Sequence, residues 1–234
     1  MSEDSVPRTA RARVRAELIT EIKEVARRHV AEHGSSTLSL RAVARDVGMV
    51  SSAVYRYFPS RDDLLTALII DAYVAFGSAA TEAERAVRRP DHLGRWMALG
   101  AGARQWAVAN SQEFALIFGS PVPGYRAPPD TIDPAAIAPL LLLAIASDAA
   151  AVGRRPAAAR PMPQAVRADL RELASTTSID LDEQVFASGL MAWTQLIGSI
   201  SFELFGHLHN VIHDYDGYFA FQMRGVGLDL GFGD

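Results

Sequence analysis

A short segment near residue 55 concentrates side chains that could form hydrogen bonds with another molecule. Ser51, Ser52, Tyr55 and Arg56 are expected on the outward face of a short helix over 51–57, because Val54 takes its buried position. Hydroxyl and guanidinium groups on an exposed helix are groups that read base edges in the DNA major groove. Arg56 could pair with a guanine or neutralise a phosphate, and its type leaves both roles open. For Tyr55 the alternative is packing beneath the turn.

The preceding residues supply the other half of a helix-turn-helix. A helix over 40–47 has a buried face at the spacing i, i+3, i+4, i+7, made of Leu40, Val43, Ala44 and Val47. Ser39 is a good N-cap for this helix. Gly48 stands where the chain must leave the helix with a positive φ, and Ser60 can cap the helix that follows. Such a pair of helices is built to enter a DNA groove.

Residues 11–75 resemble, without a gap, the DNA-binding domain of the TetR (tetracycline-repressor) family of bacterial transcription regulators. The motif appears as Val54-Tyr55-Arg56-Tyr57-Phe58 followed by Pro59-Ser60-Arg61-Asp62-Asp63-Leu64-Leu65. The family usually has Ser or Thr at the position of Val50, so Ser51 is expected to cap the second helix instead. The resemblance implies phosphate contacts by Tyr57 and Arg61. The full set of expected DNA-binding residues is Ser39, Arg41, Ser51, Ser52, Tyr55, Arg56, Tyr57 and Arg61.

The charge distribution agrees with a DNA-binding head on a different kind of body. The formal net charge of the chain is −4. Residues 1–61 contain eleven Arg and Lys and seven Asp and Glu, a net charge of +4. Residues 62–234 contain twelve Arg and Lys and twenty Asp and Glu, a net charge of −8. A basic module joined to an acidic one fits nucleic-acid binding by the first. We therefore expect a DNA-binding domain over 1–61 and a ligand-binding and dimerisation domain over 62–234.

No set of residues with catalytic spacing emerges. The chain has no cysteine, which excludes disulfides and thiolate catalysis, and it contains no Gly-x-Ser-x-Gly, phosphate-binding loop or His-Glu-x-x-His motif. His209 and His213 are four residues apart, a spacing that could bind zinc on one helix. Because Asn210 and the residues after His213 resemble a turn, a metal site is not expected. We expect neither an enzyme nor a cofactor.

The body is expected to be helical throughout, giving an all-α protein of about nine helices with a three-helix head. A helix over 62–88 joins head and body, and long helices are expected over 182–209 and 215–230. Proline-rich segments over 119–129 and 153–163 forbid regular structure. The apolar run Leu140–Ile145 is far shorter than a membrane-spanning helix. We expect a cytoplasmic location and no membrane partner.

The family resemblance implies an apolar effector cavity among the body helices. The expected ligand-binding residues are mostly aromatic: Trp96, Trp106, Phe114, Phe118, Tyr125, Trp193 and Gln195. Pockets of this kind are mainly apolar with few polar groups. Ordinary core packing is the alternative reading for each ring, and Arg104 and Gln195 fit a buried polar network or an exposed face equally well.

The helix over 182–209 is apolar on more than one face, which one thin domain cannot cover. We therefore expect a four-helix dimer interface formed by 182–209 and 215–230 of two subunits, with Met191, Ile197, Ile200, Phe202 and Phe219 in it. Two heads would then read a palindrome. The expected protein is a homodimeric repressor that a small apolar effector releases from operator DNA. A DNA-binding regulator without an effector is the alternative.

Overall fold

The computed structural model describes residues 10–156, 161–177, 179 and 182–233, and over these ranges the chain forms ten α-helices and no strand. The helices are α1 (Ala10–His33), α2 (Leu40–Val47), α3 (Ser51–Val54), α4 (Arg61–Arg85), α5 (His92–Ala109), α6 (Ser111–Phe118), α7 (Ile132–Ala151), α8 (Gln164–Ser175), α9 (Glu183–Leu204) and α10 (Tyr215–Asp229). Short 3-10 turns cover Ser35–Thr37 and Pro129–Thr131. The expected all-α class is confirmed, with ten helices in place of about nine.

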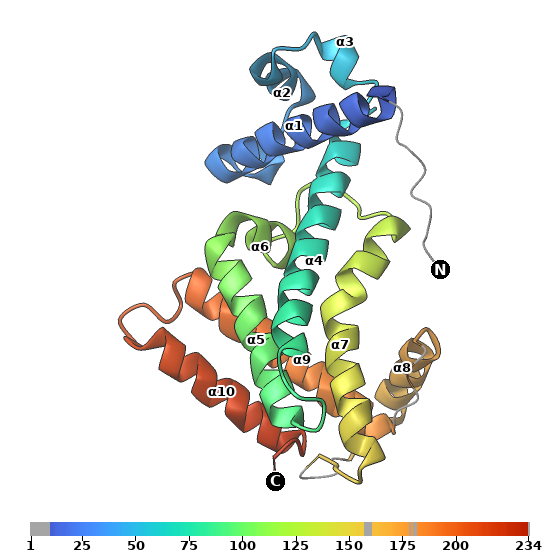
Figure 1. Ribbon diagram of the computed structural model, residues 1–234, viewed down its shortest axis with the longest axis vertical. Coiled ribbons are helices and arrows are strands. Elements are labelled where there is room, and N and C mark those ends of the chain that lie inside the picture. Colours follow the sequence, from blue (N-terminus) through green and yellow to red (C-terminus); the bar gives the residue numbers. More distant parts are fainter. Residues whose placement is uncertain (1–9, 157–160, 178, 180–181, 234) are drawn as a thin grey trace.

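The head lies at one end of the molecule, where α1 crosses the first turns of α4 and carries α2 and α3 on its outer side (Figure 1). One hydrophobic cluster holds these helices together, with Ile22 and Ala26 of α1, Val43 of α2, Val54 of α3 and Leu64 of α4 all fully buried. The first turns of α4 therefore complete the core of the head. The same helix continues into the body, so α4 connects the core of the head to the core of the body.

In the body, α5 and α7 flank α4, while α9 lies behind them and α10 lies outside α5 (Figure 1). The core contains Phe76 of α4, Trp96 and Leu99 of α5, Leu142 of α7 and Leu196 of α9. Close approach of α4 and α5 requires Gly102, since a Cβ there would lie 2.6 Å from the carbonyl oxygen of Ala79. The central position of α4 means that a change in body packing can be transmitted along it to the head.

Three segments are long and apolar enough, by length and composition, to cross a membrane: Arg61–Arg85, Pro129–Ala151 and Glu183–Leu204. The run Leu140–Ile145, which the sequence singles out, is only part of one of these apolar helices. In the fold, α4 packs on α7 and α7 on α9, and their apolar side chains supply the common core of the body.

Several predicted helix ends need correction. The helix expected over 182–209 ends at Leu204, because turns follow in which Gly206 and Asn210 have φ of 80° and 61°. The helix expected over 51–57 is α-helical only to Val54 and continues as a turn. Ser60 does cap α4, accepting a hydrogen bond from the Asp63 amide (3.1 Å).

Two other caps differ from the prediction. Ser39 occupies the N-cap position of α2 but makes no side-chain capping bond. Val50 holds the N-cap position of α3, so Ser51 is the first helical residue and not the cap. A valine cannot accept the bond that a Ser or Thr would accept there. Packing of Val54 in the head core therefore has to stabilise this short helix.

Candidate functional site

The turn between α2 and α3 presents a polar surface at the outer end of the head. Gly48 has a φ of 77° and its amide donates to the carbonyl of Arg45 (3.1 Å), which ends α2 as the sequence predicts. Arg41, Ser52, Tyr55 and Arg56 are exposed, whereas the neighbouring Ala53 and Val54 are buried. The hydroxyl and guanidinium groups are therefore exposed on one side of this segment, while its other side packs on the core of the head. Such a face can reach base edges.

The two residues assigned to phosphate contacts are already engaged within the head. Arg61 donates through Nη2 to the carbonyls of Ser35 (2.9 Å) and Ser36 (3.3 Å), and it lies 3.2 Å from the Asp62 carboxylate. Only 29% of its side chain is exposed. These bonds fix the 3-10 turn before α2 against α4. The phosphate role of Arg61 remains a prediction, and any such contact has to share the guanidinium with these carbonyls.

Tyr57 is half-buried, and the guanidinium of Arg15 in α1 lies 4.9 Å from the centre of its ring. Arg15 is itself exposed, which makes it a further candidate for a phosphate contact. Arg15 is not among the DNA-binding residues expected from the sequence. A basic residue on every second position, at Arg11, Arg13 and Arg15, was the signal that could have pointed to it.

Ion pairs fix the orientation of α1 against the rest of the molecule. His29 donates to Asp46 of α2 (2.7 Å). That bond, with a second from Arg45, holds the pKa of the Asp46 carboxyl below its usual range. On the opposite side, Lys23 and Arg27 both bond Asp71 of α4, at 2.7 and 2.5 Å.

Arg27 also approaches Glu113 of α6, with 3.8 Å between its Nε and the carboxylate. The guanidinium of Arg27 thus lies between a head helix, the connecting helix and the first body helix after α5. Through this residue the head is tied to two elements of the body.

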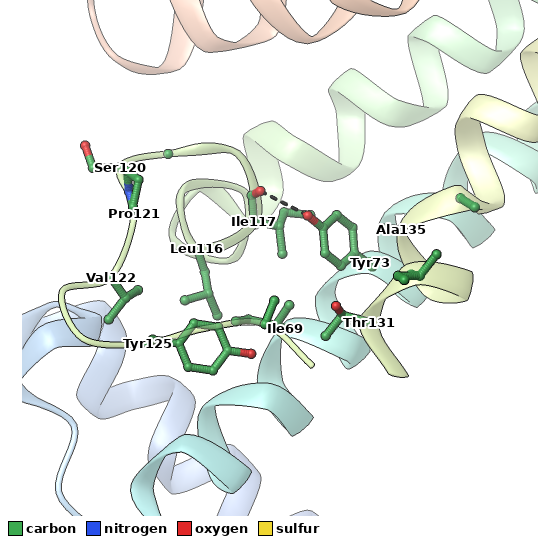
Figure 2. Close-up of a pocket in the computed structure, with 14 residues that line it drawn as sticks. Ile69, Tyr73, Leu116, Ile117, Ser120, Pro121, Val122, Tyr125, Thr131 and Ala135 are labelled. Atoms are coloured by element: carbon green, nitrogen blue, oxygen red, sulfur yellow. Dashed lines mark hydrogen bonds between the residues drawn. The ribbon is translucent and has the colours of Figure 1, made fainter. Parts of the chain in front are cut away.

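A pocket of about 640 Å³ lies where the body meets the head, between α4, α6, the proline-rich loop and α7 (Figure 2). Figure 2 shows the loop that carries Val122 and Tyr125 curving around one side, with Tyr73 and Ala135 opposite. Its lining is apolar with a few hydroxyls and no charged side chain: Ile69, Tyr73, Leu116, Ile117, Gly119, Ser120, Pro121, Val122, Tyr125, Ala127, Thr131, Ile132, Ala135 and Ala136.

The two phenols of this pocket are oriented by hydrogen bonds. Tyr73 donates to the carbonyl of Ile117 (3.3 Å), and the hydroxyls of Tyr125 and Thr66 are 2.9 Å apart. Burial, with a smaller effect of Tyr125, raises the pKa of Tyr73 above its usual range, so this phenol remains neutral at physiological pH. The pocket thus offers fixed hydroxyls in an uncharged apolar wall, an arrangement that binds neutral molecules with a few polar groups.

The residues expected to bind a ligand separate into three groups. Trp106, Phe114, Phe118 and Trp193 surround Phe76, with ring centres 5.3 to 6.4 Å from it. Contacts at these distances are those of packed aromatic cores. Tyr125 alone of the seven expected residues lines the pocket described above.

The remaining expected residues lie elsewhere. Trp96 is fully buried and its indole donates to the carbonyl of Met223 in α10 (2.7 Å). Gln195 lies on the exposed side of α9 and bonds Ser199 (3.2 Å). Arg104 makes two bonds to Glu203, at 2.6 and 2.7 Å, and a third pair with Asp216. These bonds raise the pKa of Arg104 and use the guanidinium to join α5 to α9 and α10. The position of the pocket is not visible in the sequence, because its walls include α4 and α7 residues more than 60 positions apart.

The residues assigned to a dimer interface also divide. Ile200 is fully buried and Phe219 is 7% exposed, so both belong to the core of one chain, and their assignment to an interface is wrong. Ile197 is half-buried against the same core. Met191 and Phe202 are 50% and 54% exposed. The sequence placed α9 correctly as apolar on two faces but could not tell which face α5 and α10 cover.

The turns between α9 and α10 carry His207, His209 and His213. Within the described part of the chain, no group of three His, Asp or Glu side chains is placed to hold a metal ion. All three histidines are exposed, and the ring of His207 lies 5.0 Å from the ring of Phe202 in α9.

Comparison with known proteins gives the same assignment for both parts of the chain. Residues 22–68 match the model of bacterial regulatory proteins of the tetR family, and residues 96–226 match that of the tetracyclin repressor-like C-terminal domain. HTH-type transcriptional regulators of Mycobacterium tuberculosis and Mycobacterium bovis are 37% identical over 203 residues, which is 85% of this chain and 84% of theirs.

Solved structures agree with this assignment. The crystal structure of the regulatory protein SCO4313 is 31% identical with a TM-score of 0.77, and the match covers 93% of this chain and 98% of that one. A protein with unknown function from Rhodococcus sp. RHA1 shares the fold at 20% identity, with a TM-score of 0.70 and coverage of 92% and 95%. The chain belongs to the TetR family of DNA-binding transcriptional regulators.

Proposed function

We propose that this regulator binds a palindromic operator as a homodimer, represses transcription there, and is released by a small, mostly apolar effector. The observation that carries the proposal is the path from the polar face of α2 and α3, through the single rod of α4, to a body that contains a pocket beside that rod. The proposal divides the chain into a DNA-binding head over 1–61 and an effector-binding and dimerisation body over 62–234, with α4 serving both cores.

The dimer proposal rests on an exposed apolar face shared by α9 and α10. Six large apolar side chains on these helices and the turn between them are 40% to 74% exposed: Leu190, Met191, Phe202, Phe205, Phe221 and Leu228. Exposed apolar groups gathered on two neighbouring helices mark an interaction surface. Nothing lies within 4 Å of a Cβ added at Gly198 or Gly225, so a second pair of helices can approach closely there. We infer a four-helix interface between two subunits.

A two-fold dimer presents two heads related by the same axis, and such an arrangement reads a palindrome. Within each head, Arg41, Ser52, Tyr55 and Arg56 are exposed on the face that would meet the groove. Effector control then requires two arrangements of α4, of which only one spaces the heads for the operator. An effector shifts the equilibrium by its difference in affinity for the two arrangements.

A regulator without an effector is the second candidate, and one observation favours it. Four of the rings expected to line a cavity pack around Phe76 and fill the space between α4, α5, α6 and α9. The head would then bind DNA constitutively. Both candidates are regulators of the cytoplasm without a catalytic role, as the family implies.

The test begins with selection of bound duplexes from a random DNA pool, followed by fluorescence anisotropy on the selected site and on a scrambled control. We expect an inverted repeat, a stoichiometry of two chains per site in sedimentation velocity, and affinity that falls steeply with salt. Selection of an asymmetric sequence, or of none, would contradict the proposal.

A further inference from the structure

One wall of the pocket at the head–body junction is also part of the core of the head. Val122, in the loop between α6 and α7, is 9% exposed and belongs to the same hydrophobic cluster as Ile22 and Leu64. Leu116, Ile117 and Tyr125 line the pocket and pack against that cluster as well. A molecule in the pocket would therefore touch side chains that hold the head in place.

The chemistry of the lining selects the class of molecule. Aliphatic side chains from α4, α6, the loop and α7 form most of the wall, and none of its residues carries a charge. An ion transferred into such surroundings without a partner loses its hydration at high cost. Tyr73, Tyr125 and Thr131 bring hydroxyls, each already in one hydrogen bond. A hydroxyl both donates and accepts hydrogen bonds, so these groups can bond a neutral polar group beside their present partners or in place of them.

From these contacts we infer that the pocket binds a neutral, mainly aliphatic molecule with a single hydroxyl or carbonyl group, and that binding loosens the loop from the head. This inference rests on the proposed function, because it identifies where and how an effector would act. The polar group bonds Tyr125, in competition with Thr66, and the apolar part lies against Ile69, Leu116 and Ala135. Since Thr66 is on the first turns of α4, loss of its bond to Tyr125 frees the helix that carries the head.

The coupling has a specific route. Tyr125 and Val122 lie on one loop, so movement of the tyrosine draws the valine out of the head cluster. The ion pairs of Lys23 and Arg27 with Asp71, and of Arg27 with Glu113, then still link α1 to α4 and α6. The head loses one apolar contact and keeps its fold, because the rest of its core comes from α1 to α4.

The first experiment uses decanol as the neutral probe and decanoate as its charged counterpart. Isothermal titration of the full chain should show saturable binding of decanol and at least tenfold weaker binding of decanoate at pH 7. Decanoate binding as tight as decanol would overturn the assignment of a neutral ligand. Failure of the wild-type protein to bind decanol would overturn the assignment of the ligand class, while operator binding measured on the same sample reports separately on the proposed function.

The second experiment locates the site. Ala135→Phe fills the pocket from α7 and should abolish decanol binding, whereas Ala165→Phe, on the exposed side of α8, should bind as wild type. Tyr125→Phe keeps the ring, removes the hydroxyl and should weaken decanol about 3- to 10-fold, the effect of one hydrogen bond. If Ala135→Phe does not fold, the decanol affinity of Tyr125→Phe alone tests whether the ligand lies in this pocket. Unchanged decanol affinity in Tyr125→Phe, together with unchanged affinity in a folded Ala135→Phe, would place the ligand elsewhere.

The third experiment tests the route to DNA. Saturating decanol should lower the operator affinity of the wild type about 5-fold or more, within the usual range of allosteric coupling. Thr66 does not line the pocket, and in Thr66→Val its bond to Tyr125 is absent before decanol arrives, so decanol should still bind but change operator affinity less. If decanol binds in the pocket of the wild type without any change in operator affinity, the coupling is wrong even though the site is right.

Discussion

The head and the body place their functional side chains in opposite ways. In the head, Arg41, Ser52, Tyr55 and Arg56 lie within 16 positions of one another and are exposed on α2, α3 and the turn that follows α3. In the body, the pocket collects side chains from position 69 to position 136. A DNA groove is a surface that is already in place, whereas the proposed effector has to be surrounded by side chains of the body. Local sequence can encode the first arrangement, but the second exists only after long-range packing.

The two regions also use charge differently. Ion pairs of the head, such as His29 with Asp46, lie near its surface and orient helices. The body buries Arg95 completely, with its Nε 2.5 Å from Glu84 and its Nη1 2.7 Å from Asp148. A buried charge that loses its partner is far more costly than a surface one. Mutations should therefore damage the body through stability and the head through recognition.

The largest effect is expected from Glu84→Ala. Glu84 is 3% exposed, and its removal leaves the Arg95 guanidinium buried beside fewer acceptors. Loss of one member of a buried ion pair typically costs about 3–5 kcal/mol of unfolding free energy. Urea denaturation followed by circular dichroism measures this. Glu82→Ala, an exposed residue of the same helix, is the matched control and should change stability by less than about 0.5 kcal/mol. Equal unfolding free energies of the two variants would contradict the prediction that loss of the buried ion pair is more costly than loss of a surface charge.

The next effect concerns the apolar face of the body. Phe202→Glu combined with Phe221→Glu places two charges on side chains that are 54% and 74% exposed in one chain. If this face is the dimer interface, the variant should sediment as a folded monomer, with a loss of about 2–4 kcal/mol in dimer affinity. Operator binding should fall with it. Val166→Glu, on α8, serves as the control. A double variant that remains dimeric would assign the interface to another face.

A smaller loss is expected from the exposed arginines of the head. Arg56→Ala or Arg41→Ala should cost about 1–3 kcal/mol on the selected operator and little on random DNA, if that residue reads a base. Fluorescence anisotropy on both DNAs measures the difference, with Arg88→Ala in the body as a control. Equal losses on the two DNAs for both arginines would assign recognition to Ser51, Ser52 and Tyr55.

The smallest effect on recognition is expected at Arg61. Its bonds to the carbonyls of Ser35 and Ser36 persist in the free protein, so only part of the guanidinium is available to a phosphate. Arg61→Ala should weaken all DNA sequences alike and reduce the salt slope by about one unit. Arg61→Lys should restore the slope but not the bonds to the 3-10 turn, because an ammonium lacks the fork of a guanidinium. A change in preferred bases would show that Arg61 reads sequence.

The sequence by itself determined the head and the class of the body. Apolar spacing, the glycine turn and the motif around Tyr55 and Phe58 placed α2, α3 and the start of α4, because these elements depend on neighbours a few residues away. Apolar periodicity likewise indicated helices throughout the body. The ends of α9 and α3 were misplaced because a helix end depends on the turn that follows and on packing, which override local propensity.

Only the tertiary structure decided which apolar residues meet. Ile200 and Phe202 are two positions apart on α9, and both were expected at the interface, yet the body core buries the first and leaves the second exposed. Trp96 and Trp106 lie on one helix but in different surroundings, one against Met223 and the other against Phe76. Hydrophobic burial is non-directional, so a sequence can show that a side chain will be buried without showing its partners. The pocket between Tyr73, Tyr125 and Ala135 is the space left when those partners are fixed.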